Sequence, residues 1–370
     1  MDRILPSEGS DVGSSPTGHT FFSFVLKFKI KIMGSNKSAA INTGEDFKKV
    51  KDLRGREKNI IDDIYRETGF EIGELIWSSD YFGSGVVGAV TYRGKYKNKK
   101  AVLKIQGAKP AISEVEMIES FEKQNKSKLI RTPKIFWRKK WNDKSQYEAI
   151  IMEEIWGNKI VEEGKISGKE NIKEFFDIYR EYRDKCIRKP WLGKEKNKEK
   201  IGEMIEKAWQ LSLKIKPESP FRRGSNKELA STAASLLEKT WGETEKEFVH
   251  GHLSVNDIKK QGSEVIIFSN LFWKWKYPFY DAVFGYHWQI YSLHKIAGIG
   301  PELIEEQRNL WLEEIYKLGD RKLIGAALLE RAIAGLLLDS FAYIDSNNPV
   351  AGYLVEATRA EVKRLIKELE

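Results

Sequence analysis

The sequence predicts an α+β protein of two lobes, a small antiparallel β-rich lobe followed by a large helical lobe. Three observations support this fold class. The chain has 370 residues, which is more than one compact core usually needs. Short β-like segments with glycine turns occupy residues 71–155, whereas helical periodicity dominates the longer remainder. Hydrophobic residues make up 41% of the chain and aromatic residues 12%, so a disordered chain is excluded.

Composition also restricts the expected surroundings of the protein. No segment approaches about 18 uncharged apolar residues in a row, so we expect no membrane span. The single cysteine, Cys186, excludes an intramolecular disulfide and a cysteine-based zinc cluster, and it fits a reducing cytoplasmic location. The net charge of +9 permits an anionic partner. Acidic residues are interspersed among the basic ones, however, so nucleic acid is not the partner we expect.

Residues 1–32 differ from the rest of the chain. The first twenty show no helical or strand periodicity, and three lysines in the apolar run that follows make a signal peptide a poor fit. Residues 12–17 can be back-translated as the T arm of a transfer-RNA gene. We therefore expect a non-native extension that begins in an upstream tRNA gene, with translation starting at Met33. An ordinary disordered tail is the alternative, and the genomic codons distinguish the two.

Regular structure is expected from about residue 57. The segment KNIIDDIYRETGF (58–70) has the spacing of an amphipathic helix. Its apolar face carries Ile60, Ile61, Ile64 and Tyr65. This face predicts a helix that packs on the β-rich lobe.

A glycine-rich turn follows, with Gly83, Gly85 and Gly88 in a G-x-G-x-x-G pattern. In dinucleotide-binding folds this pattern opens a helix, but residues 86–92 are β-branched and aromatic. We therefore predict strand, glycine turn, strand, basic turn and a third strand that carries Lys104. Glycines let backbone N–H groups approach phosphates, and the lysine places a cation against them. The alternative is an ordinary hairpin whose lysine reaches out to water.

The next predicted helix carries a carboxylate for this lysine. Ile118 and Phe121 lie four and seven residues after Glu114, so Glu114 is expected on the buried face. Lys104 is flanked by apolar residues, where an ammonium is costly unless it has a partner. We predict that Glu114 is this partner.

Two later segments carry further polar motifs. The apolar strand 147–152 ends in the sequence Glu153-Glu-Ile155-Trp-Gly. A helical stretch separates it from the second motif, His250-Gly-His252-Leu-Ser-Val-Asn-Asp257. An apolar strand, Ser269 and the segment Tyr-Pro-Phe-Tyr-Asp (277–281) come next.

In this order, the motifs resemble those of the aminoglycoside-phosphotransferase-like and choline-kinase-like family, across about residues 57–290. The resemblance implies a bilobal protein-kinase-like fold, with an N-lobe at 33–155 and a C-lobe at 156–370. It implies that the glycine hairpin and Lys104, which Glu114 positions, bind the phosphates of ATP or another nucleotide. The backbone from Glu153 to Ile155 would then receive the adenine.

The second motif departs from the family pattern at three positions. The catalytic Asp of the family falls on His252, and its metal-binding Asn falls on Asp257. The second metal ligand, an Asp, falls on Ser269, whose hydroxyl is a poor ligand for a hard cation such as Mg²⁺. Asp257 is therefore the one candidate metal ligand. A neutral imidazole at 252 also lacks the negative charge of the family's Asp.

Two functions remain open. The first is a pseudokinase that binds a nucleotide but lacks the catalytic and second metal-binding Asp. The second is an active ATP-dependent phosphotransferase that acts on a small-molecule hydroxyl, with His252 as base and Asp257 as the only metal carboxylate. Loss of two acidic positions favours the first. A fold without any ligand is a third alternative, and a small molecule or a protein is the expected further partner.

The carboxyl-terminal half contains two more features. The aromatic segment 271–280 either forms a stacking surface for a substrate or a wall of the core, and its lysines disfavour a polycationic aminoglycoside. From residue 301 onward the spacing predicts three helices. The apolar one, near 324–344, contains charged residues and is expected to be a buried helix of the large lobe.

Overall fold

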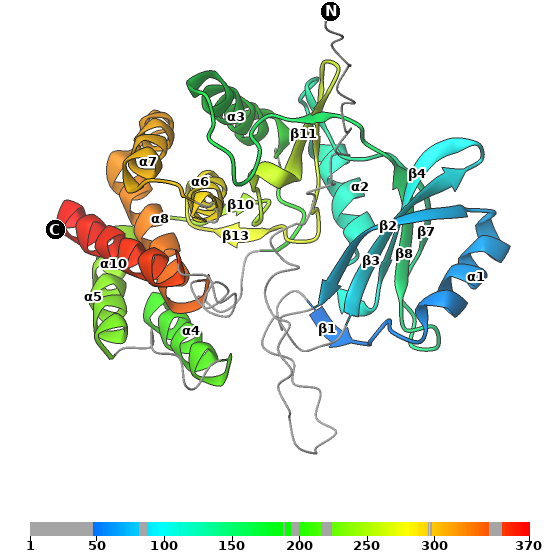
Figure 1. Ribbon diagram of the computed structural model, residues 1–370, viewed down its shortest axis with the longest axis horizontal. Coiled ribbons are helices and arrows are strands. Elements are labelled where there is room, and N and C mark those ends of the chain that lie inside the picture. The colour runs from blue at the N-terminus through cyan, green and yellow to red at the C-terminus, as the bar shows by residue number, and fades with distance from the viewer. Residues whose placement is uncertain are drawn as a thin grey trace, which may run out of the picture.

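The computed structural model shows the expected α+β architecture. It describes residues 47–80, 87–110, 112–187, 189–193, 200–215, 224–294, 296, 298–339 and 350–370. A five-stranded antiparallel sheet forms the amino-terminal part, and helices dominate the carboxyl-terminal part. Figure 1 shows the sheet on the right and the helices on the left. The predicted extension 1–32, Gly83 and Gly85 lie outside the described residues.

The five strands pair in the order β2-β3-β4-β8-β7. They are β2 (Glu71–Asp80), β3 (Val87–Tyr96), β4 (Lys99–Gln106), β8 (Glu148–Glu153) and β7 (Ile135–Lys139). The predicted basic turn joins β3 to β4 through Lys97 and Asn98, whose φ angles are 50° and 61°. Two positive φ angles are typical of a tight hairpin turn whose twist matches that of the strands. The basic turn and the predicted third strand are therefore present, the latter as β4. Lys104 on this strand lies opposite Thr91 of β3 and Ile150 of β8.

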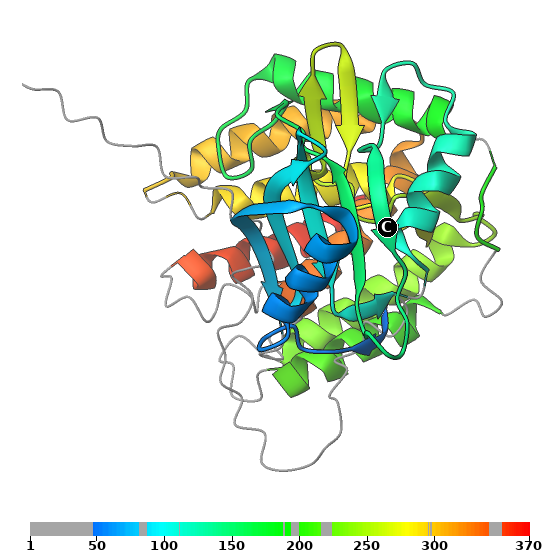
Figure 2. The ribbon, with the colours of Figure 1, turned by 90° about the vertical axis from the view of Figure 1, so that its right-hand side faces the viewer.

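Helix α1 (Glu57–Thr68) covers one face of this sheet. Ile60 and Ile64 are buried against Leu103 and neighbouring strand residues. Figure 2, which views the molecule from that side, shows α1 across the front of the strands. Tyr65 was expected on the same apolar face, but its side chain is 57% exposed. The apolar face is narrower than predicted, because the tyrosine lies at its edge and keeps its ring in solvent.

Helix α2 (Glu114–Gln124) lies between the sheet and the helical part (Figure 1). Its residues Met117 and Phe121 belong to the same buried cluster as the carboxyl-terminal helices. The Phe121 ring packs 5.4 Å from that of Trp273. The helix therefore connects the two parts and carries Glu114 at its first turn.

Short strands complete the β structure. A four-stranded sheet has the order β6-β12-β11-β9, and two pairs are β1-β5 and β10-β13. The strands are β1 (Phe47–Val50), β5 (Ala108–Pro110), β6 (Ile130–Arg131), β9 (Asn158–Lys159), β10 (Glu247–Val249), β11 (Ile258–Gln261), β12 (Glu264–Ile267) and β13 (Lys274–Lys276). The four-stranded sheet brings β9, which follows β8, next to β11, which directly follows Asp257.

The carboxyl-terminal part is built around α6 (Tyr280–Leu293), most of whose residues are buried. The surrounding helices are α3 (Lys169–Glu181), α4 (Ile201–Ile215), α5 (Gly224–Trp241), α7 (Pro301–Tyr316), α8 (Arg321–Ala334) and α10 (Val350–Leu369). The last three are the helices that the sequence predicts after residue 300. Within the described part of the chain, no helix is long and apolar enough to cross a membrane.

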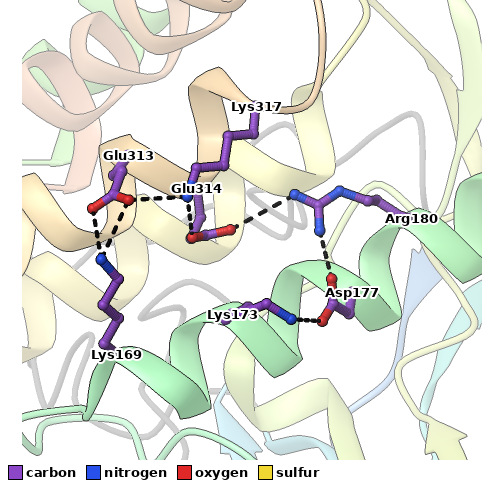
Figure 3. Close-up of polar contacts among 7 residues, drawn as sticks. All are labelled: Lys169, Lys173, Asp177, Arg180, Glu313, Glu314 and Lys317. Atoms are coloured by element: carbon purple, nitrogen blue, oxygen red, sulfur yellow. Dashed lines mark hydrogen bonds and ion pairs between the residues drawn. The ribbon is translucent and has the colours of Figure 1, made fainter.

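Helices α3 and α7 pack through an aromatic cluster and a layer of charges. The Trp311 ring lies 5.3 Å from that of Phe175 and 5.4 Å from that of Phe176. Figure 3 shows charged residues of the two helices. Lys169 and Arg180 of α3 pair with Glu313 and the buried Glu314 of α7. Arg180 also pairs with Asp177, and Lys317, just after α7, pairs with Glu314. These contacts hold the two helices in a fixed relative position.

Candidate nucleotide and catalytic site

Lys104 and Glu114 form an ion pair between the sheet and α2. Lys104 Nζ donates to Glu114 Oε2 at 2.5 Å, and the side chains are 19% and 5% exposed. Alternation along β4 places Leu103 and Ile105 under α1 and turns Lys104 to the opposite face, toward α2. The helical spacing places Glu114 on the buried side of α2, as predicted. Phosphate binding by this pair stays a prediction.

A second carboxyl group near this pair was not foreseen. Glu148 begins β8 and is 3% exposed. Burial raises the pKa of Glu148, and the negative charge of Glu114 raises it further, while Lys104 opposes the shift. The periodicity of the apolar strand gave no signal for it, because only the pairing of β4 with β8 brings Glu148 close to the lysine.

The predicted catalytic loop connects β10 to β11 and ends in a 3₁₀ turn, Val255–Asp257. Asp257 is 4% exposed, and both of its carboxylate oxygens accept hydrogen bonds. Oδ2 accepts from the Ser254 backbone N–H at 2.9 Å, the Ser254 hydroxyl at 2.6 Å and His252 Nδ1 at 3.2 Å. Oδ1 accepts from the Ser269 hydroxyl. The structure thus brings together His252, Asp257 and Ser269.

The carboxyl group of Asp257 is held in its charged form. Burial raises its pKa, but the charge and hydrogen bond of His252, the charge of His250 and the hydrogen bond from Ser254 lower it more. The pKa of Asp257 therefore lies below its usual value. The carboxylate accepts hydrogen bonds from His252, Ser254 and Ser269.

His252 is fixed by aromatic rings as well as by Asp257. Its ring stacks on Phe272 with a centroid distance of 4.7 Å, and the Phe284 ring lies 4.9 Å away. Because a carboxylate only accepts hydrogen bonds, Nδ1 carries the hydrogen in this contact. The imidazole is therefore held in one orientation.

A buried network behind the loop holds its backbone. Asp281, at the start of α6, accepts hydrogen bonds from the backbone N–H groups of His250 and Gly251, each at 2.9 Å, and from the Tyr182 hydroxyl at 3.0 Å. Burial raises the pKa of Asp281 to about 6, although these hydrogen bonds oppose the shift. Nε2 of His250 donates to the Phe268 carbonyl at 2.7 Å. The segment before Ser269 is thereby tied to the loop.

The predicted hinge follows β8. Its two glutamate side chains form ion pairs, Glu153 with Arg131 at 2.5 Å and Glu154 with Arg93 at 2.7 Å. Ile155 is buried, and its carbonyl is 3.5 Å from Lys259 Nζ. Binding of a nucleobase by the backbone of this segment stays a prediction.

The aromatic segment 271–280 is mainly a wall of the core. Leu271, Trp273 and Phe279 are buried. The Trp273 ring contacts Phe121, the Tyr182 ring and other aromatic side chains. Of the two alternatives, the core wall is the one the packing supports.

The side chains at the catalytic and metal positions do not fit a magnesium-bridging site. No group of three or more His, Cys, Asp or Glu side chains within the described ranges is arranged to hold a metal ion. Asp257 is the one carboxylate at the three motif positions, and protein donors occupy both of its oxygens. Ser269, at the other ligand position, donates its hydroxyl hydrogen to Asp257.

The chain has the bilobal, kinase-like α+β fold that aminoglycoside phosphotransferases also have. A solved structure of aminoglycoside phosphotransferase APH(4)-Ia has a TM-score of 0.52 at 9% identity, covering 83% of this chain and 98% of that one. A thermostable variant of it in a ternary complex with AMP-PNP and hygromycin B has a TM-score of 0.52 at 12% identity, covering 82% and 98%. At these identities the similarity shows the fold alone. No family model and no curated protein matches the chain.

Proposed function

We propose that the protein is a pseudokinase, which binds a nucleoside triphosphate on a kinase-like fold without transferring its γ-phosphoryl group. The observation that carries the proposal is the state of Asp257, whose two oxygens accept four hydrogen bonds from Ser254, His252 and Ser269. In phosphoryl transfer, metal ions neutralise charge on the transferring oxygens. A buried carboxylate that already accepts four hydrogen bonds must give up donors before it can hold a cation.

The Lys104–Glu114 pair supports the nucleotide-binding half of the proposal. It places a largely buried ammonium on the strand that follows the glycine hairpin, at the end of α2 that begins with Glu114. An ammonium has three N–H donors, so one that pairs with Glu114 can still donate to phosphate oxygens. A variant of the structurally similar phosphotransferase was solved with AMP-PNP, a nucleotide analogue.

The proposal also covers the cellular location of the protein and the boundary between its two lobes. We place the boundary near residue 155, where β8 of the large sheet ends and β9 joins a sheet with β11 and β12. The single cysteine is buried and unpaired, which supports a reducing, cytoplasmic location. A small molecule or a protein remains the further partner of the proposal.

One observation favours the second candidate, an active phosphotransferase. The contact of His252 Nδ1 with Asp257 has the arrangement in which a carboxylate orients an imidazole that acts as a general base through Nε2. His252 would then accept the proton of a substrate hydroxyl, and Asp257 would also be the sole metal carboxylate. These two demands on one buried carboxylate compete, so the pseudokinase fits the geometry better.

The test measures thermal stabilisation by non-hydrolysable ATP and GTP analogues, with and without Mg²⁺, and then release of γ-phosphate. We expect stabilisation in both conditions and no turnover. Lys104→Met should abolish the stabilisation, whereas Lys99→Met, on an exposed position of the same strand, should retain it. Magnesium-dependent turnover that both His252→Ala and Asp257→Ala abolish would establish the active enzyme instead. If neither analogue stabilises the protein, the nucleotide-binding part of the proposal is wrong and only the fold assignment stands.

A further inference from the structure

Lys259 places an ammonium group beside the predicted hinge. The residue lies on β11, opposite Lys159 of β9 and Ile266 of β12. Its Nζ is 3.5 Å from the Ile155 carbonyl oxygen and 5.6 Å from the centroid of the Phe268 ring. Ile155 is the hinge residue proposed to contact a nucleobase, and Phe268 directly precedes Ser269. The ammonium therefore lies between two segments of the proposed nucleotide site.

The charges around Lys259 are mainly positive. Burial lowers its pKa, the neighbouring charges of Lys159 and Arg93 lower it further, and Glu154 opposes them. Lys159 donates to the Asn256 side-chain oxygen at 2.7 Å, and Arg93 pairs with Glu154 and with Glu74. A group that carries lone pairs or negative charge is favoured beside Lys259, and a further hydrogen-bond donor is not.

This chemistry distinguishes the two purines. Guanine presents the acceptors O6 and N7 on one edge, whereas adenine presents N7 and the amino donor N6. An ammonium has three donors and no acceptor, so it satisfies the guanine edge and opposes the adenine amino group. The Ile155 carbonyl, which an adenine amino group would use, already accepts from Lys259.

We propose that Lys259 makes the nucleotide site select a 6-oxopurine nucleotide, of the guanine type, over an adenine nucleotide. The proposal rests on the proposed function, nucleotide binding between the hinge and Phe268. Lys259 acts here as a specificity residue that reads the base. Lys104, held by Glu114, would contact the phosphates, which are common to all nucleoside triphosphates.

The experiment compares the affinities of non-hydrolysable GTP, ITP and ATP analogues for the full chain by calorimetry. We expect GTP to bind at least about fivefold more tightly than ATP, the lower end for a contact that reads one base edge. ITP, which keeps O6 and N7 but lacks the 2-amino group, should bind like GTP. Lys259→Met should remove the preference, because it keeps the length of the side chain and loses the donors.

Lys260→Met is the matched control. Lys260 is the next residue on β11, but it is exposed and pairs with Glu174 at 2.5 Å. It should keep the preference for GTP. Lys259→Gln gives a second variant, whose preference should fall below that of the unaltered chain because the charge is gone.

The outcomes separate this proposal from the proposed function. Equal or tighter binding of the ATP analogue to the unaltered chain, or an unchanged preference in both Lys259 variants, overturns the role of Lys259 while nucleotide binding stands. Tight GTP binding with weak ITP binding also overturns it, because the 2-amino group would then carry the selection. If none of the three analogues binds, the proposed function fails and the proposal fails with it.

Discussion

Replacement of Asp257 by alanine should destabilise the fold, because the carboxylate is an acceptor for buried donors. The Ser254 N–H would lose its acceptor, at a cost of about 1–3 kcal/mol for an unsatisfied buried group. The Ser254 hydroxyl would also lose the acceptor of its hydrogen, at about 1 kcal/mol for a typical hydrogen bond. The hydroxyl of Ser269 can rotate toward another acceptor. We therefore expect the free energy of unfolding to fall by about 2–4 kcal/mol, from these two losses.

The assay is urea-induced unfolding, followed by circular dichroism and by the fluorescence of the 11 tryptophans. Asp257→Asn is the matched variant, since its side-chain carbonyl can still accept from Ser254. It should lose about half as much stability as the alanine variant, because one of the two oxygens remains an acceptor. An alanine variant within about 0.5 kcal/mol of the unaltered chain would refute the structural role of the carboxylate. The hydrogen bonds to the two oxygens would then be no argument against metal binding at Asp257.

Three further outcomes follow from the buried groups of the large lobe. Burial lowers the pKa of His250 and of His294 from 6.5 to about 4, so stability present above pH 6.5 is lost as the pH falls through this window. Asp281, with its pKa raised to about 6, offsets part of this loss below pH 6. We expect the free energy of unfolding, measured by chemical denaturation, to fall by at least about 2 kcal/mol by pH 4.5. A free energy of unfolding that does not change with pH would contradict this. Gly251→Ala should unfold at markedly lower urea concentration, because φ is +77° and the added Cβ would lie 2.4 Å from the Phe272 carbonyl oxygen; unchanged stability would exclude this backbone conformation. Trp311→Ala should cost about 3–5 kcal/mol by loss of a fully buried ring, and a loss below 1 kcal/mol would contradict the packing of α3 on α7.

The fold was predictable because its signals are local. The apolar neighbours of Lys104 and the 3.6-residue period of α2 predicted a pair with Glu114, and the structure joins the two side chains. Tyr65 shows the limit of the same reasoning. Its spacing places it near the apolar face of α1, but the extent of that face depends on the strands beneath it, which periodicity does not show.

The residues of the candidate site could be predicted from the sequence, but the contacts between their side chains could not. His252, Asp257 and Ser269 could be aligned with a known motif by their order along the chain. The motif could not show that Ser269 donates to Asp257, twelve residues earlier, and so occupies the oxygen left by Ser254 and His252. The folded chain thus shows Asp257 as the acceptor of four hydrogen bonds, which the motif alone did not show.

The sequence by itself determined the α+β class, the order of the elements and the ion pair of Lys104 with Glu114. These features depend on residues at most a few turns apart, whose relative positions follow from strand and helix geometry. Only the tertiary structure decided that Asp257 is saturated, that Glu148 lies near the lysine, and that Lys259 reaches the carbonyl of Ile155, 104 residues away. Contacts over such separations depend on how whole segments pack, and packing depends on the volumes and charges of all their side chains together.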